Sequence, residues 1–452
     1  AYYTDLLMEK HGVKDWGICG IALLKYDKKI YDTLVVQDGL YTLVISQPDG
    51  TTSATVIGSI TEFLYAPDNS ESVIEKMANP DIKIITLTIT EGGYNMNPAT
   101  GEFQLQDAAI QKDIQNPTKP ETIFGYLTQA LKRRKERGLA GVTVQSCDNI
   151  QQNGEVSKKM FTSYIAAAEP GILAWVEANV TFPNAMVDRI TPRPTPDVAE
   201  RVKAATGWDD KAALMGESFI QWVIEDDFIA GRPAWETVGV EMVQSVQAHE
   251  EAKIRLLNAT HSCIAWAGTL AGFQYIHEGT HHPTIRQMAY DYVTDDAIPV
   301  LHTPHNPSPI DLARYRDVVL DRFGNPAIAD TNQRVAMDAF SKIPGMIAPT
   351  IRDRLAQGAS IRSVAMLPAL FLAYLQRWHA GQIPYTYQDQ AMQPEAAHAM
   401  CEAPDPVAAF CADTTLWGEL AGDARLVDAV RRASERVSRF VTAHTGVRPA
   451  PT

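Results

Sequence analysis

The first half of the chain alternates short apolar runs with longer stretches of helical periodicity. The predicted strands are residues 16–24, 41–46, 54–60, 82–90 and 140–145, and the predicted helices are residues 1–10 and 122–137. Residues 41–46 and 54–60 alternate apolar and polar side chains, which is typical of antiparallel strands. Strands that alternate with helices of about ten residues or more predict a parallel, doubly wound α/β sheet.

The second half has helical periodicity almost throughout. Its predicted helices are residues 245–277, 284–296, 309–322, 330–342, 348–357, 361–380 and 418–445, with a Pro-rich loop at 299–309. A chain of 452 residues is long enough for two cores. We therefore predict an α/β domain over residues 1–244 and a mainly α-helical domain over residues 245–452.

The segment from Glu250 to Ser262 contains the most informative group of polar side chains. It lacks Gly and Pro and has apolar residues at helical spacing, which predicts a helix. At about 100° per residue, an arc of roughly 140° on one helical face holds the side chains of Glu250, Lys253, Asn258 and His261. Such a face could remove a proton from an alcohol and hold the resulting oxygen. A solvated helix face is the structural alternative, and spacing alone leaves both open.

Polar residues and glycines follow three of the predicted strands. In an open α/β sheet, ligands bind beyond the carboxyl ends of the strands. Asp27 follows the first predicted strand of this sequence. In a dinucleotide-binding fold, an acidic residue at the end of the second strand binds the ribose hydroxyls; a surface turn is the alternative for Asp27. Gly92 and Gly93 follow the fourth strand and could let the backbone approach a ligand, although a tight turn explains them equally well. Asn149 follows the fifth strand and is either a donor to a substrate oxygen or a plain turn residue.

Composition and charge exclude several classes of partner. The net charge of −14, without a basic stripe, argues against nucleic acid and against an anionic membrane surface. The basic residues 132–135 are most simply the solvated end of a helix. We expect neither a membrane-spanning helix nor a signal peptide. The five cysteines, without a CxxC pair, suit a reducing compartment, so we expect a cytoplasmic protein.

Several familiar motifs are missing from the sequence. It has no GxGxxG after a strand, no GxSxG and no phosphate-binding P-loop. No tyrosine is followed four residues later by lysine, so the catalytic pair of the short-chain dehydrogenases is absent. His277, His281 and His282 could bind a metal, but they lie in a segment flanked by Gly and Pro without a nearby cysteine. We therefore expect no metal site.

Longer blocks of the sequence together resemble a known family. The blocks are LTITEGGY at 87–94, SCDN at 146–149, FPNAMVDRITP at 182–192, QWVIED at 221–226, GRPAWE at 231–236, DRF at 321–323, AIAD at 327–330 and SKIP at 341–344, together with Lys253, Asn258 and His261. In this order they make the chain similar to the polyol-specific long-chain dehydrogenases, and within them to the mannitol 2-dehydrogenases. The similarity covers most of the chain and fades after about residue 380.

The resemblance implies a Rossmann-like N-terminal domain and a metal-independent, NAD-dependent oxidation of a polyol to a ketose. It implies that Lys253 is the general base, that Asn149 and Asn258 form an oxyanion clamp, and that His261 orients the substrate. Glu250 is expected near the path by which the proton leaves. The further residues that the resemblance places at the substrate are Arg334, Lys342 and Asp188, and those that it places at the cofactor are Asp27, Glu91, Gly92 and Gly93.

The implied roles are chemically consistent. A lysine has a reference pKa near 10.4, which must be lowered for it to act as a base near neutral pH. We expect burial and the nearby Arg334 and Lys342 to lower the pKa of Lys253. Asn149 and Asn258 are neutral donors that stabilise an alkoxide without adding a competing acid. Asp27 matches the acidic residue that selects NAD over NADP in the family.

The start of the chain departs from the family. The family has a first strand and a Gly-rich turn immediately before the residues that match Ala1, Tyr2 and Tyr3. Without that strand, the sheet would expose apolar neighbours such as Ile18 and Ile21, and a pyrophosphate would lose its backbone cradle. We expect the given sequence to be a piece of a longer protein; the alternative is a protein that binds NAD weakly.

The expected reaction is the oxidation of D-mannitol to D-fructose. Mannonate (fructuronate) and D-arabinitol oxidoreductases share the lysine and the asparagines, so the catalytic helix does not separate them. A non-catalytic sugar- or nucleotide-binding descendant is an alternative of another class, against which the intact Lys253 and Asn258 argue. The expected partner is a small polyol or ketose, and the resemblance favours a monomer.

Overall fold

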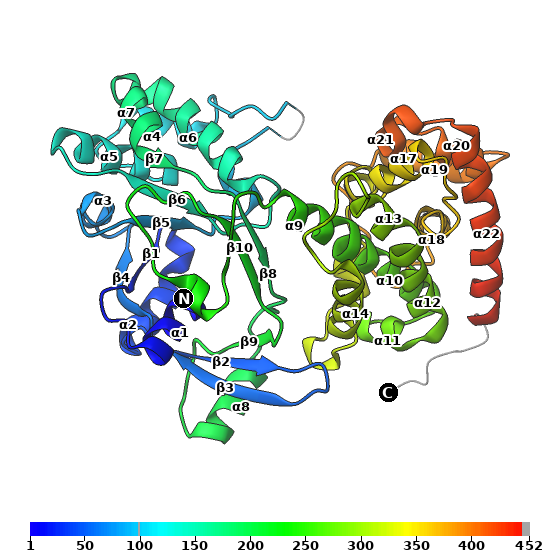
Figure 1. The fold of residues 1–452 in the computed structure, drawn as a ribbon, viewed down its shortest axis with the longest axis horizontal. Coiled ribbons are helices and arrows are strands. Elements are labelled where there is room, and N and C mark those ends of the chain that lie inside the picture. The colour runs from blue at the N-terminus through cyan, green and yellow to red at the C-terminus, as the bar shows by residue number, and fades with distance from the viewer. Residues whose placement is uncertain (98–99, 445–452) are drawn as a thin grey trace. The chain divides into compact units, whose positions relative to one another are not determined.

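The computed structural model describes residues 1–97 and 100–444, which form two compact units whose elements are labelled in Figure 1. The first unit comprises residues 1–46 and 52–247, and the second comprises residues 47–51 and the chain from residue 248 onward. Residues 445–452 of the predicted helical domain lie outside the described residues.

Parallel strands alternate with helices in the first unit. One sheet has the order β5 (Ile84–Leu87), β6 (Val142–Ser146) and β7 (Val180–Thr181), and another pairs β1 (Ile18–Ala22) with β4 (Ile60–Tyr65). The helices along this part of the chain are α1 (Tyr2–His11), α2 (Lys28–Val36), α3 (Ser70–Ala78), α4 (Ala108–Gln115), α5 (Ile123–Glu136), α6 (Asn153–Ala168) and α7 (Leu173–Asn179). Every residue of β6 is buried, as expected for a parallel strand covered on both faces. The predicted Rossmann-like fold is confirmed.

Two smaller sheets complete the first unit. One joins β3 (Thr52–Ile57), β2 (Tyr41–Ser46) and β9 (Leu214–Glu217), and the other joins β11 (Glu241–Val243), β10 (Gln221–Glu225) and β8 (Ala185–Asp188). Helix α8 spans Pro196–Thr206. The predicted single strand at 54–60 is wrong, because β3 ends at Ile57 and pairs antiparallel with β2, whereas β4 begins at Ile60 and pairs parallel with β1. The break between them is held by Asp5 of α1, whose Oδ1 accepts a hydrogen bond from the Gly58 amide.

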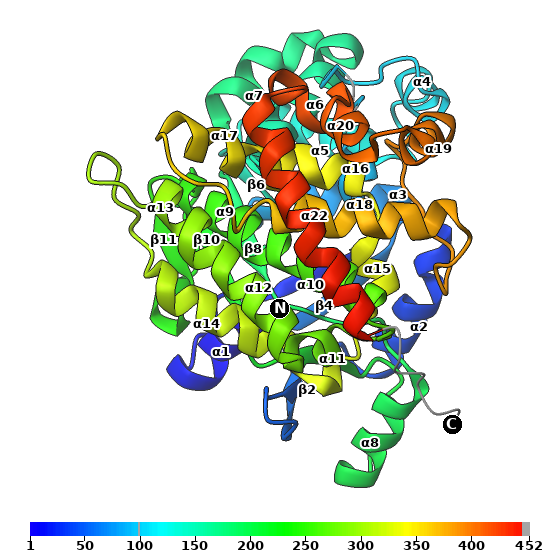
Figure 2. The same cartoon turned by 90° about the vertical axis from the view of Figure 1, so that its right-hand side faces the viewer.

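The second unit is helical. Its helices are α9 (Gln247–Ala252), α10 (Ala259–Leu270), α11 (Ile276–His281), α12 (Pro283–Asp291), α13 (Ile298–Leu301), α14 (Leu312–Phe323), α15 (Asn332–Ala336), α16 (Ala339–Lys342), α17 (Ala348–Ala356), α18 (Met366–His379), α19 (Pro394–Glu402), α20 (Pro406–Cys411), α21 (Thr414–Trp417) and α22 (Ala424–His444). Helix α10 is buried along nearly its whole length and packs against α11, α12, α15 and α18. Helix α22 packs against α18 and crosses it in the view of Figure 2. Among the described residues, no helix has the length and apolar character that crossing a membrane requires.

Within residues 1–97 and 100–444, three helical segments contain a π-helical turn. The turns are Lys253–Asn258, Tyr292–Ala297 and Ile343–Ile347, and the first packs against the other two. The sequence predicted ordinary helices for the first two of these stretches, so that expectation is wrong in detail. A π turn closes hydrogen bonds between residues five apart and costs stability, and π turns occur frequently at functional sites.

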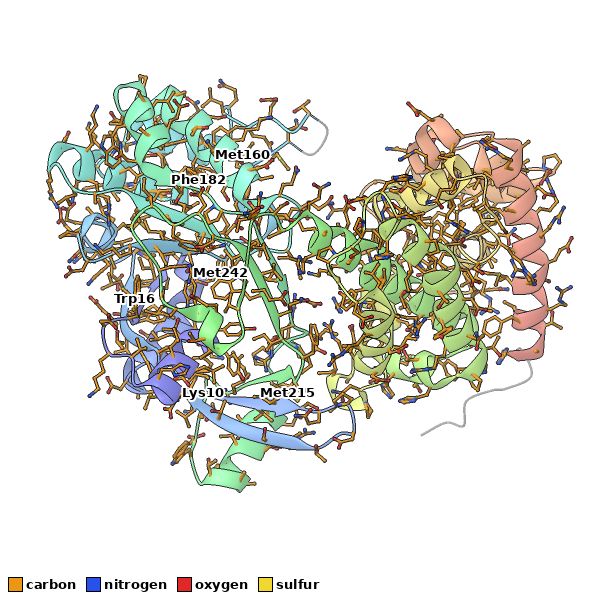
Figure 3. All side chains as sticks on the ribbon, in the orientation of Figure 1. Lys10, Trp16, Met160, Phe182, Met215 and Met242 are labelled. Carbon is orange, nitrogen blue, oxygen red and sulfur yellow. The ribbon has the colours of Figure 1, made fainter. Side chains whose placement is uncertain are left out.

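The main core of the first unit lies between its parallel sheet and helices α3, α5 and α6. Met160 of α6 is fully buried there and Phe182, just after β7, packs against it in part (Figure 3). Ile18 and Ile21 of β1 are half-buried. Arg134 is buried rather than solvated, contrary to the expectation for residues 132–135. Its guanidinium donates to four carbonyl oxygens, those of Met77, Asn79, Ile82 and Ala140, which ties the end of α5 to the segment before β5.

Candidate active site

The second unit places two of the predicted catalytic residues at the ends of one π turn. Lys253 opens the turn and Asn258 closes it. Because π hydrogen bonds join residues five apart, the backbones of these two residues lie one above the other along the helix. The predicted arc assumed α-helical angles throughout, so its width of roughly 140° does not apply across this π turn. The Lys253 side chain is buried, as is that of Glu250 in the preceding α9, so neither belongs to a solvated face.

His261 and Arg334 share one carboxylate. His261 in α10 has its Nε2 3.1 Å from Oδ2 of Asp330 and stacks on Phe323 with the ring centroids 4.3 Å apart. Arg334 in α15 donates from Nε to Oδ1 of Asp330 at 2.6 Å and from Nη2 to Oδ2 at 2.5 Å. The structure therefore brings two of the predicted residues together through an aspartate that the sequence did not single out.

The charges of this cluster are set by burial and by the shared carboxylate. Burial lowers the pKa of His261, against the pull of Asp330, so its imidazole is neutral near pH 7. Burial would raise the pKa of Asp330, but the contacts with His261 and Arg334 hold that pKa well below its usual range. The hydrogen bonds to Asp330 raise the pKa of Arg334, whose side chain is 63% exposed. The cluster is thus a carboxylate and a guanidinium beside a neutral imidazole.

Lys342 is a lysine with a lowered pKa. It ends α16, is half-buried, and donates from Nζ to the carbonyl oxygen of Val335 at 2.6 Å. Burial, together with the nearby Arg334, lowers its pKa from 10.5 to about 8, although Asp338 and Asp389 act in the opposite direction. Its amine therefore changes charge within the pH range in which enzymes are assayed.

Asp330 is the member of this cluster that the sequence analysis missed as a site residue. It occurs in one of the blocks of family resemblance, and it lies four residues before Arg334. An acidic residue four positions before an arginine is a common pair on a helix surface, so this spacing alone indicates nothing special. Its contact with His261 joins positions 69 residues apart (330 minus 261), and no local pattern predicts that.

In the first unit, Asn149 lies in a bend directly after β6 and is exposed. The preceding Asp148 is buried and shapes the neighbouring loop. Its Oδ1 accepts the amide of Thr90 at 2.9 Å, and its Oδ2 accepts the amide of Ile89 at 3.0 Å and the hydroxyl of Tyr94 at 2.6 Å. Thr90 has a positive φ of 63°, a conformation that costs energy for a β-branched residue. Asp148 therefore holds together the strand ends that carry Asn149 and the predicted cofactor loop.

The predicted cofactor residues lie after β5 and β1. Glu91, Gly92 and Gly93 form a short 3₁₀ turn in which Glu91 and Gly92 are exposed. A Cβ at Gly92 would meet no atom within 4 Å, so its backbone faces open space, whereas one at Gly93 would come within 2.8 Å of Ile89 Cβ. Asp27 is half-buried and its Oδ2 accepts the amide of Leu24 at 3.1 Å.

Asp188 lies in β8, and the three histidines lie in α11 and directly after it. Asp188 ends β8, is buried, and stands opposite Gln221 in the antiparallel register. His281 Nε2 lies 2.7 Å from the carbonyl oxygen of Gly324, and His282 Nε2 lies 2.9 Å from His444 Nε2. His277 stacks on Tyr275. Within the described ranges, no group of three or more His, Cys, Asp or Glu side chains is placed to hold a metal ion.

Each half of the chain matches a domain of the same known family. The mannitol dehydrogenase Rossmann domain matches residues 2–237, and the mannitol dehydrogenase C-terminal domain matches residues 245–438. The chain therefore belongs to the mannitol dehydrogenase family. It is a polyol dehydrogenase.

Characterised relatives align over most of the chain. A D-arabinitol 4-dehydrogenase of Ralstonia nicotianae is 52% identical over 90% of this chain and 86% of its own length. A D-arabinitol 4-dehydrogenase of Klebsiella pneumoniae is 44% identical over 98% of this chain and 95% of its own length. A mannitol 2-dehydrogenase of Aspergillus fumigatus is 38% identical over 97% of this chain and 88% of its own length.

Two solved structures of polyol dehydrogenases also match nearly the whole chain. A D-sorbitol dehydrogenase in substrate-free form superimposes with a TM-score of 0.91 at 34% identity, covering 98% of this chain and 91% of that one. The Pseudomonas fluorescens mannitol 2-dehydrogenase, in a ternary complex with NAD and D-mannitol, gives a TM-score of 0.79 at 36% identity, with coverage of 98% and 90%.

Proposed function

We propose that this enzyme oxidises one secondary alcohol of a linear polyol to a ketose, with NAD as the hydride acceptor and Lys253 as the general base. The buried Lys253 at the start of a π turn that ends at Asn258 carries the proposal. A lysine buried among helices is costly unless its charge is used or neutralised. A base and an amide donor on consecutive turns of one helix suit an alcohol that becomes a carbonyl.

Two observations support the residues proposed for NAD. Asp27 follows the carboxyl end of β1 and has a carboxylate oxygen, Oδ1, that accepts no hydrogen bond from the described residues. Gly92 offers exposed backbone after the carboxyl end of β5, with space where a side chain would otherwise stand. We propose that Asp27 binds the ribose hydroxyls and that the Glu91–Gly93 turn approaches the cofactor. NAD, when bound, supplies the hydride acceptor.

The chain's own residues supply the acid–base chemistry. We propose that the Lys253 amine accepts the hydroxyl proton as the carbinol carbon becomes a carbonyl. Bound NAD would take up the hydride from that carbon. Asn258, with Asn149 from the first unit as the second proposed donor, stabilises the oxygen while it carries negative charge. Glu250, buried one turn before Lys253, is proposed to pass the proton onward. His261 and Arg334 are proposed to orient the other hydroxyls, Lys342 to bind them as a cation, and Asp188 to line the substrate site.

Asp330 is proposed as a positioning residue. A carboxylate 3.1 Å from Nε2 favours the His261 tautomer that carries its proton on that atom, which leaves Nδ1 as an acceptor for a hydroxyl. Neutral His261 can accept such a hydrogen bond, whereas imidazolium cannot. We therefore propose that Asp330 fixes both the orientation of the His261 ring and the position of the Arg334 guanidinium.

Replacement of Asp330 by asparagine is expected to lower kcat by about tenfold or more and the free energy of unfolding by about 1–3 kcal/mol. The amide no longer balances Arg334, and it no longer specifies one His261 tautomer. Kinetics and urea unfolding measure both effects, and Asp428→Asn, at an exposed ion pair on α22, is the matched control. Asp330→Glu should restore part of kcat. A loss of stability with unchanged kcat would show a purely structural role.

Lys342 is expected to make ketose binding depend on pH. Its amine is protonated below its pKa of about 8 and loses its charge as the pH rises through that value. The KM for the ketose should therefore rise through this range in the wild type. In Lys342→Arg, whose side chain keeps its charge, the KM should stay flat over the same range. An identical rise in both enzymes would assign the titration to another group.

The substrate is proposed to be a polyol with the configuration shared by D-mannitol and D-arabinitol. Numbered from its C5 end, D-arabinitol has the same configuration at its first three carbinol carbons as D-mannitol has at C2, C3 and C4. Oxidation of D-arabinitol at C4 and of D-mannitol at C2 are thus the same reaction on chains that differ by one carbon. D-Arabinitol joins the expected D-mannitol as a candidate because two relatives, 52% and 44% identical, are D-arabinitol 4-dehydrogenases.

The test is NADH formation from D-mannitol, D-arabinitol, L-arabinitol, D-sorbitol and D-mannonate, with and without a metal chelator. We expect the first two substrates to give the highest kcat/KM and the chelator to have no effect. A preference for D-mannonate would overturn the polyol assignment in favour of a sugar acid. Loss of activity with the chelator would overturn the metal-independent mechanism. Absence of NADH binding would favour the non-catalytic alternative.

A further inference from the structure

A pocket separate from the proposed catalytic residues lies within the second unit. It has a volume of about 380 Å³ and is lined by residues of α12 and α22 and by residues just before and at the start of α18. Figure 2 labels these three helices. Residues 284, 287, 288 and 291 of α12 form one wall at helical spacing, and residues 436, 439 and 440 of α22 form another. The volume falls in the range of small-molecule sites.

The lining combines an apolar floor with cations. Met288, Met366 and Phe440 provide apolar surface, and Arg436 and Arg439 provide two guanidinium groups. Phe440 is buried and Arg436 is half-buried, so the arginine stem packs into the wall rather than extending into solvent. Such a pocket suits a ligand that is apolar at one end and charged at the other.

The two pocket arginines differ from the others on the same helix. Arg425, Arg431 and Arg432 each form an ion pair with an aspartate. Arg436 and Arg439 form no ion pair with an acidic side chain of the described chain. Arg436 instead donates from Nη2 to the backbone carbonyl oxygen of Arg362 at 2.8 Å. Arg362 is thus a third arginine beside Arg436 and Arg439, and its charge acts on Arg436.

These cations stand together in a protein of net charge −14. Burial lowers the pKa of Arg436, and the charges of Arg362 and Arg439 lower it further, whereas Asp291 raises it. Uncompensated neighbouring cations repel one another, so an anion between them would be stabilised. Asp291, which also lines the pocket and accepts a hydrogen bond from Gln287, is the one carboxylate of the lining.

We propose that this pocket binds a small organic carboxylate with an apolar body. The planar guanidinium groups of Arg436 and Arg439 match the two oxygens of a carboxylate, and Met288, Met366 and Phe440 cover its carbon chain. The charge of Asp291 favours a monoanion over a doubly charged phosphate. The site is independent of the proposed polyol chemistry, since none of its residues belongs to the catalytic proposal.

The test is calorimetric titration of the full chain with octanoate, octan-1-ol and inorganic phosphate. We expect octanoate to bind, and Arg439→Gln, at an exposed position, to weaken it by about tenfold or more. Asp291→Asn keeps the size of the side chain and removes the opposing charge, so it should tighten octanoate binding severalfold. Arg432→Gln, on the same helix but outside the pocket, is the matched control and should leave the affinity unchanged.

Several results would overturn the proposal. Equal binding of octan-1-ol would show an apolar pocket without anion recognition, and equal binding of phosphate would show a simple anion site. Loss of octanoate binding in Arg334→Gln with none in Arg439→Gln would place the ligand at the proposed catalytic residues. An equal loss in Arg432→Gln would show a nonspecific charge effect. No binding of octanoate to the wild type would also reject the site.

Discussion

Replacement of Lys253 by alanine is expected to lower kcat by about 10²–10⁴-fold in both directions of the reaction. The alcohol proton then has no positioned acceptor, and in ketose reduction the forming alkoxide has no proton donor. The affinity for NADH should stay unchanged, because the residues proposed for the cofactor lie in the first unit. Steady-state kinetics and NADH fluorescence titration measure the two quantities separately.

Chemical rescue separates a lost base from a disturbed helix. Lys253→Ala opens a space at a residue that is buried, and a small amine such as methylamine should restore part of kcat at a rate that follows the concentration of its unprotonated form. Lys253→Met fills the same space and should be equally inactive but not rescued. If Lys253→Ala keeps wild-type kcat, Lys253 is not the base, and Lys342, with its pKa of about 8, becomes the next candidate.

Replacement of Asn258 by alanine is expected to lower kcat by about 10²–10³-fold with a small change in KM. The amide hydrogen bond is proposed to strengthen as negative charge develops on the reacting oxygen, so its loss falls on the transition state rather than on ground-state binding. Asn149→Ala should have an effect of the same kind from the first unit. Kinetics with the polyol and with the ketose should show equal losses.

Because Asn258 ends a π turn, its replacement could also disturb the helix, so a variant of the same side-chain size is needed as a control. Asn258→Asp keeps the size of the side chain but replaces a donor with an acceptor and adds a negative charge, so it should be at least as inactive as Asn258→Ala while retaining its melting temperature. Asn306→Ala, at an exposed loop position of the same unit, should leave kcat unchanged. A large fall in melting temperature for both Asn258 variants, with kcat preserved, would make the residue structural.

Local patterns predicted the architecture because secondary structure follows side-chain periodicity over short windows. The buried strand β6 and the helix α5 have nearly the predicted bounds. The error at 54–60 arose because the apolar pattern runs through Gly58 without interruption, whereas the pairing partners change there. Pairing is a long-range property, and a sequence window does not contain the partner strand.

Side-chain environments were harder to predict than elements. Arg134 belongs to a basic run that predicts a solvated helix end. It is buried instead, and its guanidinium donates hydrogen bonds to four backbone carbonyl oxygens of neighbouring segments. The π turn at Lys253–Asn258 has no sequence signature, since its residues are ordinary helix formers. The turn packs against the two other π turns, which lie far from it along the chain.

The sequence by itself determined the fold class, the helical character of the second half, and the residue types proposed for catalysis. The tertiary structure decided that Asp330 bridges His261 and Arg334, that Lys342 has a lowered pKa, and that Asp148 ties the Asn149 bend to the Thr90 turn. The physical reason is one of range. Periodicity acts between neighbours along the chain, whereas burial and charge depend on what packing brings together from distant segments.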